Sequence, residues 1–236
     1  MDSEGLITGN GNPPKKPAAT RRSTTIPASI QAYDFAKHKI LVGTFPGGEL
    51  ISEGEIADQL QISRTPVREA FLRLQSEGLL RLYPKKGAMV VPVSKQEIEM
   101  VFETRLLLER FAVEKVFDTH MAVFVADEID SLVQLQMKAL EDKDPIEFAE
   151  LDRTIHTSIL NATANSILAN LYSSLRDRQI RMFNILLYLN PVRVETIVKE
   201  HKGFATLLRQ NDRENLIIAI TDHARLTRDA LLDGNI

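Results

Sequence analysis

The sequence predicts a mainly α-helical protein in two parts: a small domain with a helix, a tight turn, a second helix and a hairpin, followed by an all-α bundle of six helices. Residues 51–93 combine short helical patterns with two strand-like runs, whereas residues 94–236 show only helical periodicity, interrupted by Asp, Pro and Asn. The 236 residues suffice for one large or two small domains, each with its own core.

Composition is that of an ordinary globular protein with a charge asymmetry. There is no cysteine, which excludes disulfides and thiolate metal sites. Residues 1–93 contain 12 Lys and Arg against 9 Asp and Glu, and the remaining residues contain 17 against 23. A basic domain joined to an acidic one is typical of a DNA-binding protein. No apolar run reaches membrane-spanning length and no apolar signal core is evident, so we expect a cytoplasmic protein with no membrane partner.

Three segments are expected along the chain. Residues 1–27 are rich in Gly, Pro, Ser and Thr with paired Lys and Arg, which predicts a disordered basic tail. Residues 28–93 form the first domain, whose first helix begins near Ser29 and ends at Gly43. Residues 94–236 form the helical domain, with helices expected at about 95–117, 122–142, 145–161, 164–188, 191–210 and 213–233.

The first domain contains the signals of a helix-turn-helix. Ser52 followed by Glu55 predicts a capping box and a helix to about Gln59. Thr65 is expected to cap the second helix, with Pro66 at its first position. The apolar face of that helix is predicted to consist of Val67, Ala70, Phe71 and Leu74, and strands are predicted at 80–83 and 89–91 around a Pro84–Gly87 turn.

Polar residues at the start of the second helix predict contact with DNA. A helix-turn-helix places this end in the major groove, where Arg64 and Arg68 can form paired hydrogen bonds with guanine. Periodicity alone is equally compatible with a solvated helix in another small domain. The residues expected to contact DNA are Ser52, Arg64, Thr65, Arg68, Arg73, Lys85, Lys86 and Gly87.

Two sequence motifs make the assignment of the first domain more specific. Arg64-Thr-Pro-Val-Arg68-Glu-Ala and Glu77-Gly-Leu-Leu, followed by a Lys-Lys-Gly turn, resemble the winged helix-turn-helix of the GntR superfamily of bacterial transcription regulators. Residues 94–232 resemble the FCD-type effector domain, and six helices favour its VanR-like subgroup over the FadR-like one. The resemblance implies a homodimer on double-stranded operator DNA, and a repressor released by a small carboxylate effector. Gly54 departs from relatives that carry an Arg near this position.

Three helix histidines and one carboxylate form a candidate metal site. Asp152 and His156 lie four residues apart on one helix face, while His201 and His223 lie within two later helices. This donor set suits a divalent transition metal, but spacing alone leaves three unrelated histidines as the alternative. The resemblance implies the metal site, because these four positions match the metal-binding pattern of the FCD branch. Zinc is favoured, with nickel, iron or manganese as alternatives.

The resemblance also implies an effector pocket in which a carboxylate meets the metal on one side and an arginine on the other. Arg105 is the first candidate, and an ion pair with Glu109 is the alternative role for it. Further candidates are Asn161, Asn165, Arg178 and Arg181, of which the arginines could also form a solvated face.

Two other functions remain open from the residues alone. A metal-dependent hydrolase carrying a nucleic-acid-binding module would use the same histidine–carboxylate site, although no general acid or base is evident. A DNA-binding adaptor with a purely structural histidine site is the third possibility.

Overall fold

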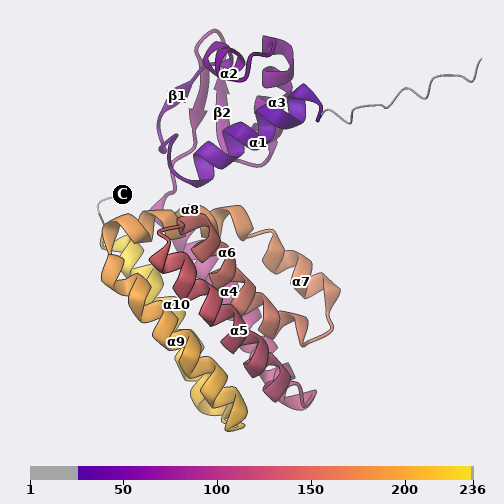
Figure 1. The fold of residues 1–236 in the computed structure, drawn as a ribbon, viewed down its shortest axis with the longest axis vertical. Coiled ribbons are helices and arrows are strands. Elements are labelled where there is room, and N and C mark those ends of the chain that lie inside the picture. The colour runs from indigo at the N-terminus through magenta and orange to yellow at the C-terminus, as the bar shows by residue number, and fades with distance from the viewer. Residues whose placement is uncertain (1–25, 235–236) are drawn as a thin grey trace, which may run out of the picture.

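The computed structural model describes residues 26–234, so the predicted tail falls almost entirely outside the described residues. A small domain, here called the head, sits on one end of a helical bundle (Figure 1). The head comprises α1 (Ala28–Leu41), β1 (Leu50–Ile51), α2 (Glu53–Leu60), α3 (Arg64–Ser76), β2 (Leu80–Tyr83) and β3 (Gly87–Val90). The bundle comprises α4 (Lys95–Asp118), α5 (Ala122–Glu141), α6 (Pro145–Asn161), α7 (Ser166–Ser173), α8 (Arg176–Leu189), α9 (Pro191–Arg209) and α10 (Arg213–Leu232).

The predicted elements of the head are present, but α3 begins at Arg64 and β3 at Gly87, both earlier than predicted. The Ser52 hydroxyl accepts a hydrogen bond from the Glu55 amide at 3.1 Å, and the Glu55 carboxylate accepts one from the Ser52 amide at 2.9 Å, so the capping box is confirmed. Thr65 does not cap α3 as predicted. The N-cap residue is Ser63, because its backbone is still extended where Thr65 is already helical.

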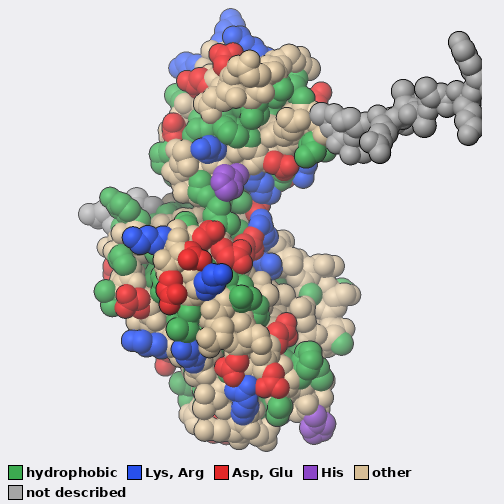
Figure 2. Space-filling view, in the orientation of Figure 1, with side chains coloured by type: hydrophobic (Ala, Val, Ile, Leu, Met, Phe, Trp, Pro, Cys, Tyr) green, Lys and Arg blue, Asp and Glu red, His purple; other side chains and the backbone are tan. Residues whose placement is uncertain are grey.

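A three-stranded antiparallel sheet in the order β1-β3-β2 completes the head. The two-residue strand β1 was not predicted, because so short a segment shows no alternation. Gly87 begins β3 with φ at 98°, and a side chain there would collide with the carbonyl oxygen of Ile51. Glycine at this position therefore allows β1 and β3 to pair. The β2–β3 turn brings lysines to the tip of the head (Figure 2).

The bundle buries one continuous apolar core, in which α5 packs on α6 and α9, and α10 packs on α4 and α9. The stretch expected as one helix at 164–188 is two helices, α7 and α8, so the bundle has seven helices and the count that favoured the VanR-like subgroup does not hold. The break lies at Ser174 and Leu175, where the Leu175 amide donates to the Tyr172 carbonyl three residues back, as in a 3₁₀ turn. No helix among residues 26–234 is long and apolar enough to cross a membrane.

One face of α8 carries the head. The side chain of Asn184 donates to the Leu41 carbonyl at 2.6 Å, and Arg181 donates to the Val91 carbonyl. Leu41 and Val93 are buried in the apolar core of the bundle rather than in that of the head. The connection between the domains is therefore packed and hydrogen-bonded.

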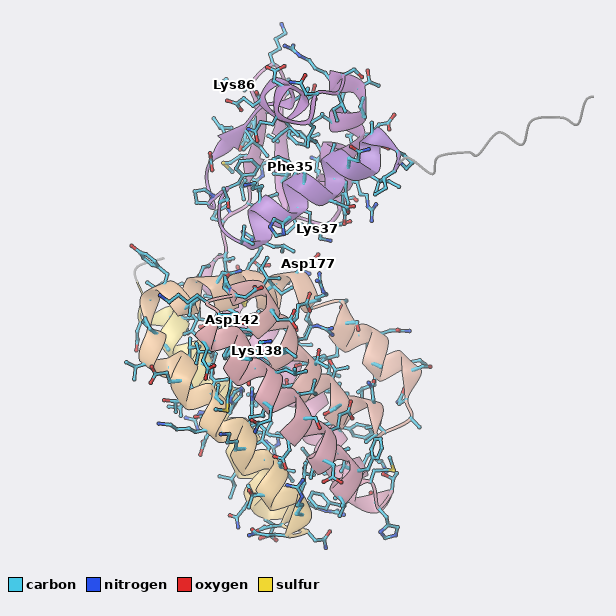
Figure 3. The ribbon with its side chains drawn as sticks, in the orientation of Figure 1. Phe35, Lys37, Lys86, Lys138, Asp142 and Asp177 are labelled. Carbon is cyan, nitrogen blue, oxygen red and sulfur yellow. The ribbon has the colours of Figure 1, made fainter. Side chains whose placement is uncertain are left out.

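A charged cluster completes the junction around Lys37 of α1, which faces Asp177 at the start of α8 (Figure 3). The ammonium lies 2.7 Å from the Asp177 carboxylate, 2.9 Å from that of Glu77 and 2.7 Å from the Tyr33 hydroxyl. Partial burial lowers the pKa of Lys37, but the hydrogen bonds to Asp177, Glu77 and Tyr33 outweigh it and raise that pKa above its usual value. Lys37 thus joins α1, the end of α3 and α8.

Replacing Asp177 with Asn should loosen the head on the bundle. Loss of the charge pair with Lys37 should weaken docking by about 1 kcal/mol and accelerate thermolysin cleavage between residues 91 and 94 by about fivefold. Asp118→Asn provides the control, because it removes an ion pair with Arg213 at the far end of α4. Equal cleavage rates in both variants would show that the Lys37 cluster does not hold the head.

Candidate metal centre and DNA-binding surface

The four predicted metal ligands meet inside the bundle. Asp152 and His156 project from α6, His201 from α9 and His223 from α10, and one donor atom from each lies within 4.8 Å of the others. The imidazole centroids are 5.0 to 5.3 Å apart. The three histidines are buried and Asp152 is half-buried. The family resemblance therefore identified a set of residues that folding brings to one point, which spacing alone had left open.

The Nδ1 atom of each histidine faces a different outer partner. His201 donates to the side-chain oxygen of Gln136 at 2.9 Å, and His223 donates to the Glu200 carboxylate at 2.6 Å. Nδ1 of His156 lies 3.0 Å from Oε2 of Glu109, at an angle short of a good hydrogen bond. Partners of this kind fix the imidazole tautomer and leave Nε2 available for a metal.

Electrostatics keep two of the imidazoles neutral. Burial and the neighbouring histidines lower the pKa of His201 well below its usual value. Burial also lowers the pKa of His223, although its bond to Glu200 opposes the shift. Burial raises the pKa of Glu200, but hydrogen bonds from His223 and Arg193 outweigh it and lower that pKa to about 2. Burial thus favours the neutral form of both imidazoles, which is the form that binds a metal.

Orphaned atoms at the centre test whether the residues fit a metal. Nε2 of His156 and Nε2 of His201 are buried, and neither has a hydrogen-bond partner among residues 26–234. Nε2 of His201 lies 3.6 Å from the Asp152 carboxylate, too far for a direct hydrogen bond. Buried polar atoms without partners are unfavourable, and a cation would satisfy them together. Three nitrogens and one carboxylate oxygen therefore fit a divalent transition metal.

A cavity lies beside the candidate metal site and is also lined by Arg105. Its polar lining includes Asp152, His223 and Arg105, and the walls include Val101 and Phe183. Arg105 is buried and its Nε donates to the Glu109 carboxylate at 2.8 Å, so the predicted ion pair exists. Nη2 of Arg105 has no partner among the described residues. One guanidinium therefore makes the ion pair and also borders the cavity.

The other four predicted effector residues do not line this cavity. Asn161 is exposed at the end of α6, and Asn165 caps α7 by accepting from the amides of Ile167 and Leu168. Arg178 donates to the Glu97 carboxylate at 3.1 Å, and Arg181 holds the head. Helical periodicity could not distinguish these positions, because it does not give the direction of a helix relative to the cavity.

A second concave surface lies on the head, between the start of α3 and the β2–β3 hairpin. Six of the eight predicted DNA-binding residues line it, namely Ser52, Arg64, Arg68, Lys85, Lys86 and Gly87. The arginines and lysines form no ion pairs within residues 26–234, so their charges are available to a partner. Lys86 extends from the tip of the hairpin (Figure 3).

The remaining two predicted DNA contacts have different surroundings. Thr65 is exposed in the first turn of α3, beside the groove residues Arg64 and Arg68. Arg73 lies more than two turns further along α3, where it pairs with Glu77 and covers the Tyr33 ring at 3.6 Å. Arg73 therefore also borders the junction cluster, and its contact with DNA stays a prediction.

Sequence reasoning missed the outer partners of the histidines. Glu200 precedes His201 directly, and Gln136 is a buried polar residue on α5. Glu109 was considered only as a partner for Arg105. Glu200 accepts two hydrogen bonds from the Arg193 guanidinium, at 2.5 and 2.8 Å. The helical spacing of apolar residues could have marked Glu109 as an acidic residue on the apolar face of α4.

Two family models match the chain, one over each domain. Residues 29–90 match the family described as bacterial regulatory proteins of the gntR family, and residues 99–226 match the FCD domain. The chain is 29% identical over 194 residues to the HTH-type transcriptional regulator YdhC of Bacillus subtilis, covering 80% of this chain and 84% of that protein. It is 26% identical over 209 residues to the gluconate operon transcriptional repressor of the same organism, covering 86% and 84%.

A solved structure shows the same fold. The GntR regulator from Rhodococcus sp. RHA1 superposes with a TM-score of 0.70 at 17% identity, covering 88% of this chain and 99% of that one. At this identity the likeness shows the fold alone. The named relatives are transcription regulators, so the hydrolase alternative is set aside. The chain belongs to the GntR family of bacterial regulatory proteins, as a DNA-binding transcription regulator in which an FCD domain follows the head.

Proposed function

We propose that this protein is a cytoplasmic repressor that leaves its operator when a small carboxylate binds beside a metal ion in the bundle. The observation that carries this proposal is the cavity lined by Asp152, His223 and Arg105, whose Nη2 has no hydrogen-bond partner among residues 26–234. Repression is proposed because relatives such as the gluconate operon regulator are named repressors.

The basic groove of the head supports the DNA-binding role. Arg64 and Arg68 at the start of α3 would read bases, since arginine can bond to both acceptors of guanine in the major groove. Lys85 and Lys86 on the hairpin would contact phosphate, and Ser52 and Thr65 would add neutral contacts to the backbone.

The metal would be held by Asp152, His156, His201 and His223. Zinc is proposed for this donor set, and nickel, iron or manganese would also accept it. A bound ion supplies positive charge and an open coordination position for a carboxylate oxygen.

The cavity defines the chemistry of the effector. Nη2 of Arg105 would bind an anionic oxygen from the side opposite the metal ligands. The remaining walls include Val101, Phe102, Met182 and Leu186. The space between them is about 20 Å³, enough for one water molecule, so an acid could enter only if these walls move apart.

Helix α8 connects the cavity with the head. Met182, Phe183 and Leu186 line the cavity from one face of α8. On its other face, Asp177, Arg181 and Asn184 hold the head. A ligand that moves α8 would therefore change the position of the recognition helix. The change requires that the ligand bind the two positions with different affinities.

Exposed apolar side chains support a homodimer. Met100, Leu107 and Phe111 follow one face of α4, and Leu107 is 72% exposed. Ile167 and Leu171 are exposed on α7, which packs against α4. We propose that these faces of α4 and α7 bind the same faces of a second copy, since two heads are needed to read a two-fold operator.

Substitutions in the head should separate base reading from phosphate binding. Arg68→Ala should weaken specific binding by about 1–3 kcal/mol and relax one operator position, whereas Lys85→Ala should lower affinity evenly and flatten the salt dependence. Fluorescence anisotropy with duplexes from upstream of the protein's own gene would measure both, with Lys138→Ala as the control on the bundle. Unchanged specific affinity for Arg68→Ala would contradict the assignment of α3.

Removal of two ligands should abolish metal binding. Asp152→Ala combined with His201→Ala should lose the metal in elemental analysis. It should also lose the stabilisation by zinc, which is about 2.7 kcal/mol when free zinc is 100 times its dissociation constant. His38→Ala changes an exposed histidine and is the control. The same metal content in all three proteins would rule out the site.

A charge on the apolar face of α4 should dissociate the dimer. Leu107→Glu would bury a carboxylate at the interface and raise the dimer dissociation constant at least about tenfold, which corresponds to about 1.4 kcal/mol. Analytical ultracentrifugation would compare it with Leu135→Glu, which changes an exposed leucine on α5. If both variants dimerise like the wild type, the interface lies elsewhere.

A further inference from the structure

We propose that Glu109 is the positioning residue of the metal centre, which orients His156 toward the ion while it holds Arg105 at the cavity. The inference rests on the proposed metal site and adds a residue that provides no metal ligand itself. Glu109 lies on α4 and is completely buried.

Three helices converge on the Glu109 carboxylate. Its Oε1 accepts from Nε of Arg105 on α4 and from the hydroxyl of Tyr172 on α7, both at 2.8 Å. Its Oε2 faces Nδ1 of His156 on α6 at 3.0 Å. The two oxygens therefore have separate tasks, since one is held in place and the other is directed at a metal ligand.

A fixed carboxylate beside Nδ1 determines which nitrogen of His156 is free. Oε2 lies 3.0 Å from Nδ1 and, once aligned, would accept a hydrogen bond from the Nδ1–H group. The lone pair would then lie on Nε2, which is buried near the other ligands. Only a short movement is needed to align the Nδ1–H with Oε2. Without an acceptor at this position, His156 could take the other tautomer, in which Nε2 carries the proton and cannot bind a metal.

Glu109 differs from the two other outer partners. Gln136 offers His201 a neutral oxygen, and Glu200 is held by Arg193, which does not line the cavity. Of the three, Glu109 alone binds an arginine that borders the cavity. Glu109 therefore links the metal ligand His156 to the arginine proposed to bind an anionic ligand.

The graded test uses Glu109→Gln and Tyr172→Phe in the full chain. Glu109→Gln keeps the shape of the side chain but removes its charge, and should lower zinc affinity by about 10- to 100-fold. Tyr172→Phe keeps the carboxylate and loses only one of its donors, so its loss should be smaller and in the same direction. Stripped proteins would be titrated with zinc against a competing chromophoric chelator, and with cobalt to record visible absorption bands. The cobalt bands of Glu109→Gln should shift.

The outcomes separate a positioning role from a structural one. A Glu109→Gln protein that is less stable but has wild-type zinc affinity and wild-type cobalt bands would overturn the inference and leave the metal site standing. A wild-type protein that binds neither ion would overturn the metal site and the inference together. If Glu109→Gln does not fold, Tyr172→Phe decides, because an unchanged zinc affinity there would also overturn the proposed role.

Discussion

The bundle depends on satisfying a group of polar side chains in its dry centre. Burial of imidazoles and carboxylates is unfavourable unless each polar atom has a partner. Gln136, Glu200 and Glu109 face the outer nitrogens of the three histidines, and they come from α5, α9 and α4. The inner atoms of His156 and His201 lack partners within the described chain. The same requirement that holds five helices together thus creates a site for a cation.

The head is tied to this centre through α8. Asp177, Arg181 and Asn184 are spaced so that they lie on one side of the helix, and each contacts the head or its linker. Met182 and Leu186 lie on the other side, against the cavity. Leu41 and Val93 are also buried in the bundle core, so a displacement of α8 would move the head with it.

Sequence patterns predicted the helices and strands and the grouping of the metal-ligand candidates better than they predicted what surrounds each side chain. The capping box of Ser52 and the grouping of Asp152 with three distant histidines followed from local spacing and, for the histidines, from a family resemblance. The break at Ser174 was invisible, because apolar residues continue at helical intervals through it. Arg181 was predicted at the effector and lies at the junction, since periodicity gives the face of a helix but not what covers that face.

The two roles considered for Arg105 are compatible once its hydrogen bonds are counted. A guanidinium has five N–H donors, and the Glu109 carboxylate uses the Nε donor. The ion pair orders a buried side chain that lines the cavity, and its Nη2 has no hydrogen-bond partner among residues 26–234. A ligand carboxylate would then meet an arginine that is already ordered, so the pair with Glu109 reduces the entropy lost on binding rather than competing with it.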